Sequence, residues 1–136
     1  MKKRVLVCGA SGFIGRNLIE HFSRKEGLVV YGTYLNNEQL NKRNPHPHLW
    51  RVDLTNKEHV DAIVSQGFDY VIHCAAKTEG SGAYNAESSI AANTRMNLNT
   101  AEAAHVHKVG HFIFLSCTVM YPSSQRPLRE WEFDLD

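Results

Sequence analysis

Residues 5–22 read VLVCGASGFIGRNLIEHF, and this stretch decides the fold. A short apolar strand runs directly into a turn with glycines at 9, 12 and 15, and the turn opens a segment with helical spacing. Gly9 permits a tight turn, Gly12 lets the backbone approach a pyrophosphate, and Gly15 lets the helix pack closely on the sheet. Amides left unpaired at the helix N-terminus then face the anion. The order of strand, turn and helix therefore predicts a phosphate-binding turn.

Outward from this turn, short apolar runs rich in β-branched residues alternate with segments of helical spacing, which is typical of a parallel sheet with crossover helices. The expected strands are Arg4–Cys8, Leu28–Thr33, Leu49–Val52, Tyr70–Cys74 and His111–Ser116. In VLVC and FIFL the apolar residues are consecutive, so these strands are expected to be covered on both faces. The predicted fold class is α/β, a doubly wound parallel sheet of about five strands in the order 3-2-1-4-5.

Three helices are expected between the strands, and the third runs from about Ala86 to His107 because that segment lacks Gly and Pro. Loops are expected over Asn36–Pro47 and Lys77–Tyr84, which are rich in Asn, Gly, Ser and Pro. The apolar stripes that should lie on the sheet are Ile14, Leu18 and Phe22 in the first helix, and Val60, Ile63 and Val64 in the second.

The composition is that of one ordinary globular domain. The chain has 136 residues, of which 43% are apolar and 21% charged, and the net charge of +1 favours neither nucleic acid nor an anionic membrane as a partner. No apolar run approaches the ~20 residues of a membrane span, so a cytoplasmic protein is expected. Cys8, Cys74 and Cys117 have no metal-ligand spacing, which predicts small buried side chains and no metal site. The eight histidines are expected in surface or capping roles.

The glycine spacing is GxxGxxG, and with its flanking strand and helix it resembles the opening of the extended short-chain dehydrogenase/reductases, the NAD-dependent epimerase/dehydratase family with a Rossmann fold. The resemblance covers nearly the whole chain and implies the nucleotide-binding portion of an epimerase, dehydratase or reductase that acts on nucleotide sugars. Asp53 matches an aspartate that in this family hydrogen-bonds the adenine amino group, and Ala75 and Ala76 match small residues that lie against the dinucleotide. The cofactor-binding residues expected on these grounds are Gly9, Ser11, Gly12, Phe13, Ile14, Gly15, Asp53, Leu54, Ala75, Ala76, Lys77 and Asn93.

Two of these residues have alternative roles. Asp53 could be the N-cap of the following helix, although Thr55 or Asn56 could cap that helix instead. Lys77 could contact a phosphate or a sugar, or it could be a solvated lysine on a glycine-rich loop.

Asn93 and Asn99 also resemble family residues, and helix geometry separates them. Asn93 shares a helix face with Thr100, whereas Asn99 is turned away by about 120°. Asn93 is therefore the better candidate for a contact on the cofactor side. Asn99 could equally satisfy buried backbone groups.

The end of the second expected strand bears on the choice between NAD and NADP. An acidic residue there would hydrogen-bond the ribose diol of NAD, whereas a nearby arginine would accommodate the 2′-phosphate of NADP. Residues 31–37 read YGTYLNN and contain no carboxylate, which favours NADP over NAD. Arg16, Lys42 or Arg43 could supply the positive charge, or each could be a solvated surface group.

The resemblance also implies where catalysis would occur. The family uses a tyrosine and a lysine in YxxxK for proton transfer, together with a serine or threonine after the fifth strand. The sequence contains no YxxxK. Cys117 holds the serine position, and Ser116 or Thr118 would take that role if the turn is shifted by one residue. Val119 stands where one group of these enzymes carries a cysteine, which speaks against epimerase activity.

Two interpretations therefore stay open. The first is the nucleotide-binding portion of an NAD(P)-dependent sugar-nucleotide enzyme, inactive by itself, whether as an N-terminal fragment or as the product of a gene that lost its catalytic half. The second is a non-catalytic module that senses a cofactor or binds a partner. A dinucleotide-binding domain is expected over residues 1–121, with 122–136 an irregular tail that starts a missing catalytic or substrate portion. A sheet without later strands has an uncovered edge, so a homo-oligomer is expected.

Overall fold

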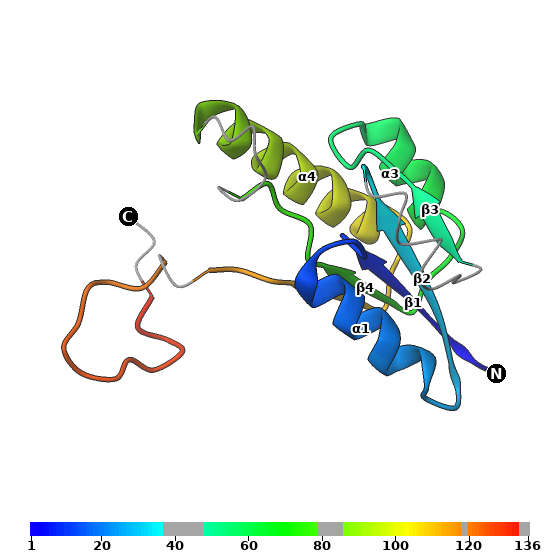
Figure 1. The fold of residues 1–136 in the computed structure, drawn as a ribbon, viewed down its shortest axis with the longest axis horizontal. Helices are drawn as coiled ribbons and strands as arrows, with labels where there is room; N and C mark the ends of the chain where they lie inside the picture. The colour runs from blue at the N-terminus through cyan, green and yellow to red at the C-terminus, as the bar shows by residue number, and fades with distance from the viewer. Residues whose placement is uncertain (37–47, 79–85, 118–119, 134–136) are drawn as a thin grey trace.

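A computed structural model describes residues 1–36, 48–78, 86–117 and 120–133 of the chain. Its strands form one parallel sheet in the order β3-β2-β1-β4-β5, and the expected order is therefore confirmed. The strands are β1 (Lys3–Cys8), β2 (Leu28–Tyr34), β3 (Leu49–Arg51), β4 (Tyr70–His73) and β5 (His111–Phe114), and the helices are α1 (Phe13–Ser23), α3 (Lys57–Val64) and α4 (Ala86–Val106). Figure 1 shows α1 on one face of the sheet and α3 with α4 on the other, which is a Rossmann-like α/β arrangement.

The central strand β1 supplies both hydrophobic cores. Leu6 and Cys8 pack with the apolar stripe of α3 on one face, while Val5 and Val7 pack with Ile19 of α1 on the other. All four β1 residues are buried, because alternate side chains of a strand point to opposite faces and both faces carry helices. The prediction that VLVC is covered on both faces is therefore confirmed.

The stripe predicted for α1 is wrong at its first residue, since Ile14 is 49% exposed. The buried residues of α1 are Gly15 and Ile19, with Leu18 and Phe22 packed at the margin of the same core. The buried face is therefore centred one residue later than predicted, because Gly15, and not Ile14, is the residue of α1 that packs against the backbone of Gly9. The stripe of α3 is confirmed, as Val60, Ile63 and Val64 are all buried.

The prediction that FIFL is covered on both faces is also wrong. Ile113 is 45% exposed and Phe114 is 46% exposed. The reason is position, because β5 is an edge strand that pairs with β4 alone in the described sheet. Apolar side chains on both sides of an edge strand leave a surface that another segment could cover.

Residues 120–133 contain no helix of a full turn and no strand, and Figure 1 draws them apart from the sheet. This segment closes on itself through an ion pair between Arg126 and Glu132, and the amide of Arg129 donates to Glu132 Oε2 at 2.8 Å. Trp131 is 69% exposed, so little apolar surface is buried there. None of the helices described here is both long enough and apolar enough to cross a lipid bilayer.

Candidate functional site

A pocket opens at the carboxyl ends of β1, β2, β3 and β4, where open parallel sheets bind their ligands. The glycine turn, the ends of the neighbouring strands and one residue of α4 surround it. The residues that line it are Gly9, Ser11, Gly12, Thr33, Tyr34, Leu35, Val52, Asp53, Leu54, Thr55, Cys74, Ala75, Ala76, Lys77 and Met96. The pocket thus brings together most of the expected cofactor-binding residues.

Gly9 and Gly15 are glycines for reasons internal to the fold. Gly9 has φ +86°, and a Cβ there would lie 2.8 Å from the backbone nitrogen and Cα of Ala75. A Cβ on Gly15 would overlap the carbonyl oxygen of Gly9 and lie 2.8 Å from its carbonyl carbon. The turn therefore holds α1, β1 and the segment after β4 in backbone contact.

Gly12 differs from these two glycines. Its φ of −73° and ψ of 169° are extended backbone that any residue adopts. A Cβ there would have one neighbour, the Gly9 carbonyl oxygen, at the ordinary contact distance of 3.4 Å. Neither strain nor packing among the described residues requires a glycine at this position. The free space above Gly12 is the space that a ligand approaching the backbone would fill.

The electrostatics of the turn suit an anion. Gly12 is the N-cap of α1, and no side chain caps the helix. The first turn of α1 contains no acidic residue, and Arg16 lies there. Unpaired amides and the positive end of the helix dipole attract negative groups. The structure thus offers a cradle for phosphate at one side of the pocket.

Asp53 lies two residues after the end of β3 and lines the pocket together with the glycine turn. Its Oδ1 accepts hydrogen bonds from the Thr55 hydroxyl at 2.7 Å and the Thr55 amide at 2.9 Å, and these bonds lower the pKa of the carboxyl group. Asn56 caps α3, because its side chain accepts from the His59 amide at 3.1 Å. Asp53 is therefore not the N-cap, and its Oδ2 has no hydrogen bond within the described residues.

Asn93 of α4 holds the segment that follows β4. Its Oδ1 accepts from the Lys77 amide at 2.8 Å and its Nδ2 donates to the Lys77 carbonyl at 3.1 Å. Asn93 does not line the pocket. Its role in this structure is to position the backbone beside Ala75 and Ala76, and the exposed side chain of Lys77 remains at the pocket edge.

Asn99, about two turns further along α4, holds the backbone of the segment after β3. Its Nδ2 donates to the carbonyl oxygens of Leu54 at 3.0 Å and Thr55 at 3.1 Å. The alternative in which Asn99 satisfies backbone groups is therefore confirmed. Asn93 and Asn99 of α4 thus each brace a loop of the pocket.

Several predicted residues lie elsewhere, and several lining residues were not predicted. Phe13, Ile14 and Gly15 start α1 beside the pocket, and Ser116 and Cys117 follow β5 without lining it. Cys117 is exposed and Cys74 only half-buried, so the expectation of three buried cysteines holds for Cys8 alone. Thr118, Val119, Lys42 and Arg43 lie outside the described residues.

The pocket is also lined by residues that the sequence did not predict, and these are Thr33, Tyr34, Leu35, Val52, Thr55, Cys74 and Met96. Most of these could have been found as the residues that end parallel strands.

His73 at the end of β4 corrects the expectation that the histidines lie on the surface. It is 1% exposed, and its Nε2 lies 2.9 Å from Asn97 Oδ1. Because a carbonyl oxygen only accepts, Nε2 carries the proton, and the buried Nδ1 has no hydrogen-bond partner among the residues that the structure describes. Burial lowers the pKa of His73. No group of three or more potential metal ligands is found in the part of the chain that is described.

We expect the free energy of unfolding to fall as the pH drops below about 6.5, the ordinary pKa of histidine. The lowered folded-state pKa means that the unfolded chain binds this proton more readily, so the stabilisation present above pH 6.5 is lost on acidification. Urea unfolding at several pH values between 7.5 and 5.5 measures this slope. His73→Gln should flatten it, whereas His21→Gln, at an exposed residue, should not. Equal slopes in all three proteins would contradict the assignment to His73.

The sheet and its pocket define an α/β protein with a ligand site at the carboxyl ends of its strands. The sequence profile described as the NAD dependent epimerase/dehydratase family matches residues 5–134. The chain belongs to this family. It is 29% identical over 132 residues to the GDP-L-fucose synthase of Azorhizobium caulinodans, a match that covers 94% of this chain and 38% of that protein. Lys77, Asn93, Asn99 and the Tyr121–Pro122 step are the residues whose pattern resembles the GDP-L-fucose synthases.

Solved structures share the fold. The epimerase Mth375 of Methanothermobacter thermautotrophicus superposes with a TM-score of 0.81 at 23% identity, covering 99% of this chain and 42% of that one. The UDP-glucose 4-epimerase of Bifidobacterium longum, solved with NAD+ and UDP, has a TM-score of 0.76 at 21% identity, covering 95% of this chain and 42% of that one. The chain thus spans about two fifths of the length of these relatives.

Proposed function

We propose that this chain is the dinucleotide-binding portion of an NAD(P)-dependent enzyme that acts on nucleotide sugars as an epimerase, dehydratase or reductase. The observation that carries the proposal is the single pocket where the glycine turn, Asp53 and the Ala75–Lys77 segment meet. The turn would hold the pyrophosphate, because its helix is uncapped and Gly12 leaves the backbone open. When bound, the nicotinamide supplies hydride transfer.

The chain's own residues would bind and orient the cofactor. The free Oδ2 of Asp53 is suited to accept a hydrogen bond from the adenine amino group, because the Thr55 bonds keep the carboxyl ionised and fix its direction. Asn93 holds Ala75 and Ala76 where small side chains leave room for the dinucleotide. NADP is the proposed cofactor, with NAD the alternative, because Tyr34, Leu35 and Asn36 put no carboxylate at the end of β2.

Turnover is not proposed for these residues alone. The sequence has no YxxxK pair, and the serine position offers only Ser116, Cys117 or Thr118. Cys117, a weak hydrogen-bond donor at the serine position, favours a second candidate, a cofactor-sensing or partner-binding module without turnover. A nucleotide-sugar substrate, self-association through the exposed edge of β5, and a boundary near residue 121 stay predictions. Activity of a longer reading frame that encodes YxxxK would favour the enzyme over the sensing module.

Calorimetric titration of the chain with NADPH, NADH and the hypoxanthine analogue of NADPH tests the site. We expect NADPH to bind about tenfold more tightly than the analogue, which replaces the amino group by an oxygen that repels Asp53. Asp53→Asn should abolish that preference, because an amide can donate to the oxygen. The matched control is Glu58→Gln, an exposed residue outside the pocket, which should leave it unchanged.

Two outcomes would count against the proposal. Failure of all three dinucleotides to bind the wild-type chain would remove the proposed function. Binding with no preference for adenine would leave a dinucleotide site but remove the role of Asp53.

A further inference from the structure

Arg51 ends β3 and lies at the border of the pocket, yet the sequence pattern did not single it out. Its Cα pairs with that of Tyr34 in the parallel register of β2 and β3. Its Nε donates a hydrogen bond to the carbonyl oxygen of Leu35 at 3.0 Å. Tyr34 and Leu35 both line the pocket. The guanidinium group is therefore fastened to the end of β2 by one of its nitrogens.

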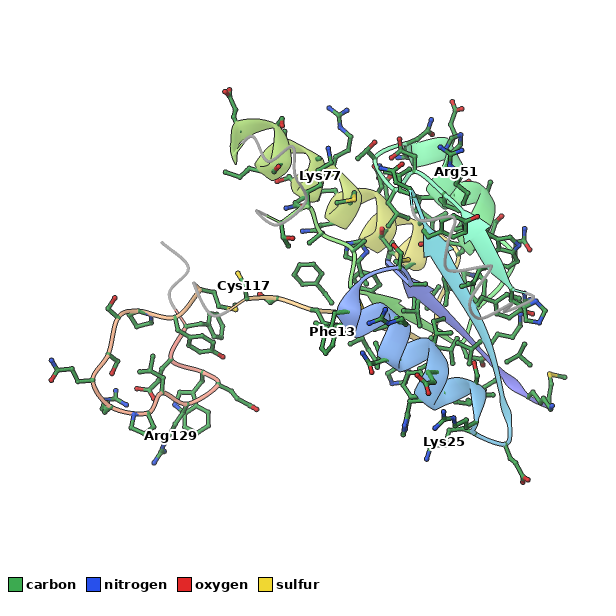
Figure 2. The ribbon with its side chains drawn as sticks, viewed as in Figure 1. Phe13, Lys25, Arg51, Lys77, Cys117 and Arg129 are labelled. Carbon is green, nitrogen blue, oxygen red and sulfur yellow. The ribbon has the colours of Figure 1, made fainter. Side chains whose placement is uncertain are left out.

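Within the described ranges, both Nη groups of Arg51 have no hydrogen-bond partner, because its one bond uses Nε. Among the residues that the structure describes, no carboxylate lies within ion-pair distance of this side chain. The end of β2 contributes Tyr34, Leu35 and Asn36, and none of these is acidic. Figure 2 shows Arg51 at the same end of the sheet as Lys77, with Lys25 at the opposite end. The border of the pocket beside β2 thus carries an exposed, uncompensated cation.

We propose that Arg51 determines the selectivity of this site for NADPH over NADH by binding the 2′-phosphate of the adenosine ribose. The inference rests on the proposed function. The ribose hydroxyls of a dinucleotide lie at the end of the second strand of such sheets, which is where Leu35 holds the guanidinium. A guanidinium binds phosphate through a planar pair of N–H groups, and a side chain that is already anchored loses less freedom when it does so.

The absence of a carboxylate strengthens the assignment. An aspartate or glutamate at the end of β2 would repel a phosphate and would pair with Arg51, and neither effect is present in residues 31–36. Arg16 lies in the first turn of α1, beside the phosphate cradle and not at the end of β2. Among the described cations, Arg51 is the one that is hydrogen-bonded to the end of β2.

Titration of wild-type protein and Arg51→Gln with NADPH and NADH tests the inference. We expect the substitution to weaken NADPH binding roughly tenfold or more and to leave NADH binding unchanged, because only NADPH carries the 2′-phosphate. The salt dependence of NADPH binding should also decrease. Lys25→Gln removes the same charge at the opposite end of the sheet and should change neither affinity.

The outcomes separate this inference from the proposed function. Equal weakening of NADPH and NADH by Arg51→Gln would mean that Arg51 only supports the end of β2, and would overturn the inference. Equal binding of both nucleotides by wild-type protein would do so too, while leaving a dinucleotide site intact. No binding of either nucleotide by wild-type protein would overturn the proposed function itself. If Arg51→Gln does not fold, Arg51→Lys, which keeps the charge but loses the planar fork, should lower the ratio of NADPH to NADH affinity.

Discussion

Gly15→Ala is expected to lower the free energy of unfolding by about 3 kcal/mol, although alanine is normally the better helix former by about 1 kcal/mol. The new Cβ would overlap the Gly9 carbonyl oxygen and lie 3.0 Å from the Ala10 Cα, and all of these neighbours are backbone atoms. Relief would require α1 to move away from the sheet and its core around Ile19. Urea unfolding followed by circular dichroism measures the change.

Gly12→Ala is the matched control for this substitution. It adds the same methyl group to the same turn, at a position with ordinary backbone angles and an ordinary contact distance of 3.4 Å. Its free energy of unfolding should stay within about 0.5 kcal/mol of wild type. A Gly15→Ala protein as stable as the control would show that α1 does not pack this closely on the turn.

Gly12→Val is expected to leave the fold intact and to weaken NADPH binding on the order of 100-fold, because the side chain fills the space through which a pyrophosphate reaches the backbone amides. The extended backbone at Gly12 accepts valine without strain. Unfolding and calorimetric titration are measured on the same preparation, so loss of binding is separated from loss of structure.

Gly12→Ala is the control for side-chain size, and it should weaken NADPH binding less than Gly12→Val does, because its methyl group fills less of the space above the backbone. An affinity that is unchanged in both variants would show that no ligand approaches the backbone at this turn. A loss of affinity that accompanies a loss of stability would instead assign Gly12 a structural role, contrary to the open space around it.

Local patterns explain why much of the architecture was predictable. VLVC is buried on both faces because two helical layers cover the central strand. Its consecutive apolar residues predict this burial, since a strand with one solvated face would alternate apolar and polar residues. Val60, Ile63 and Val64 repeat at helical spacing and are buried together. The pocket residues of the glycine turn, Asp53 and Ala75–Ala76 follow strands, and parallel strands bring their carboxyl ends to one edge.

Contacts between distant segments explain the errors. FIFL has the same apolar pattern as VLVC, but β5 pairs with a strand on one side only. No local feature of the FIFL sequence indicates that the described sheet ends at this strand. Ile14 is exposed because the position of Gly9 decides which residue of α1 faces the sheet. His73 is buried because Asn97 of α4 lies over β4.

The sequence by itself determined the class of fold and the turn that would hold a phosphate, because strand and helix periodicity and glycine spacing act over a few neighbouring residues. The order of the strands followed from the right-handed connections of doubly wound sheets. Only the tertiary structure decided what the side chains at the pocket border do. Asn93 and Asn99 became braces of two loops, and Arg51 became a cation at the end of β2. These roles depend on hydrogen bonds across 16 to 45 positions of the chain, and such partners are selected by packing and not by local spacing.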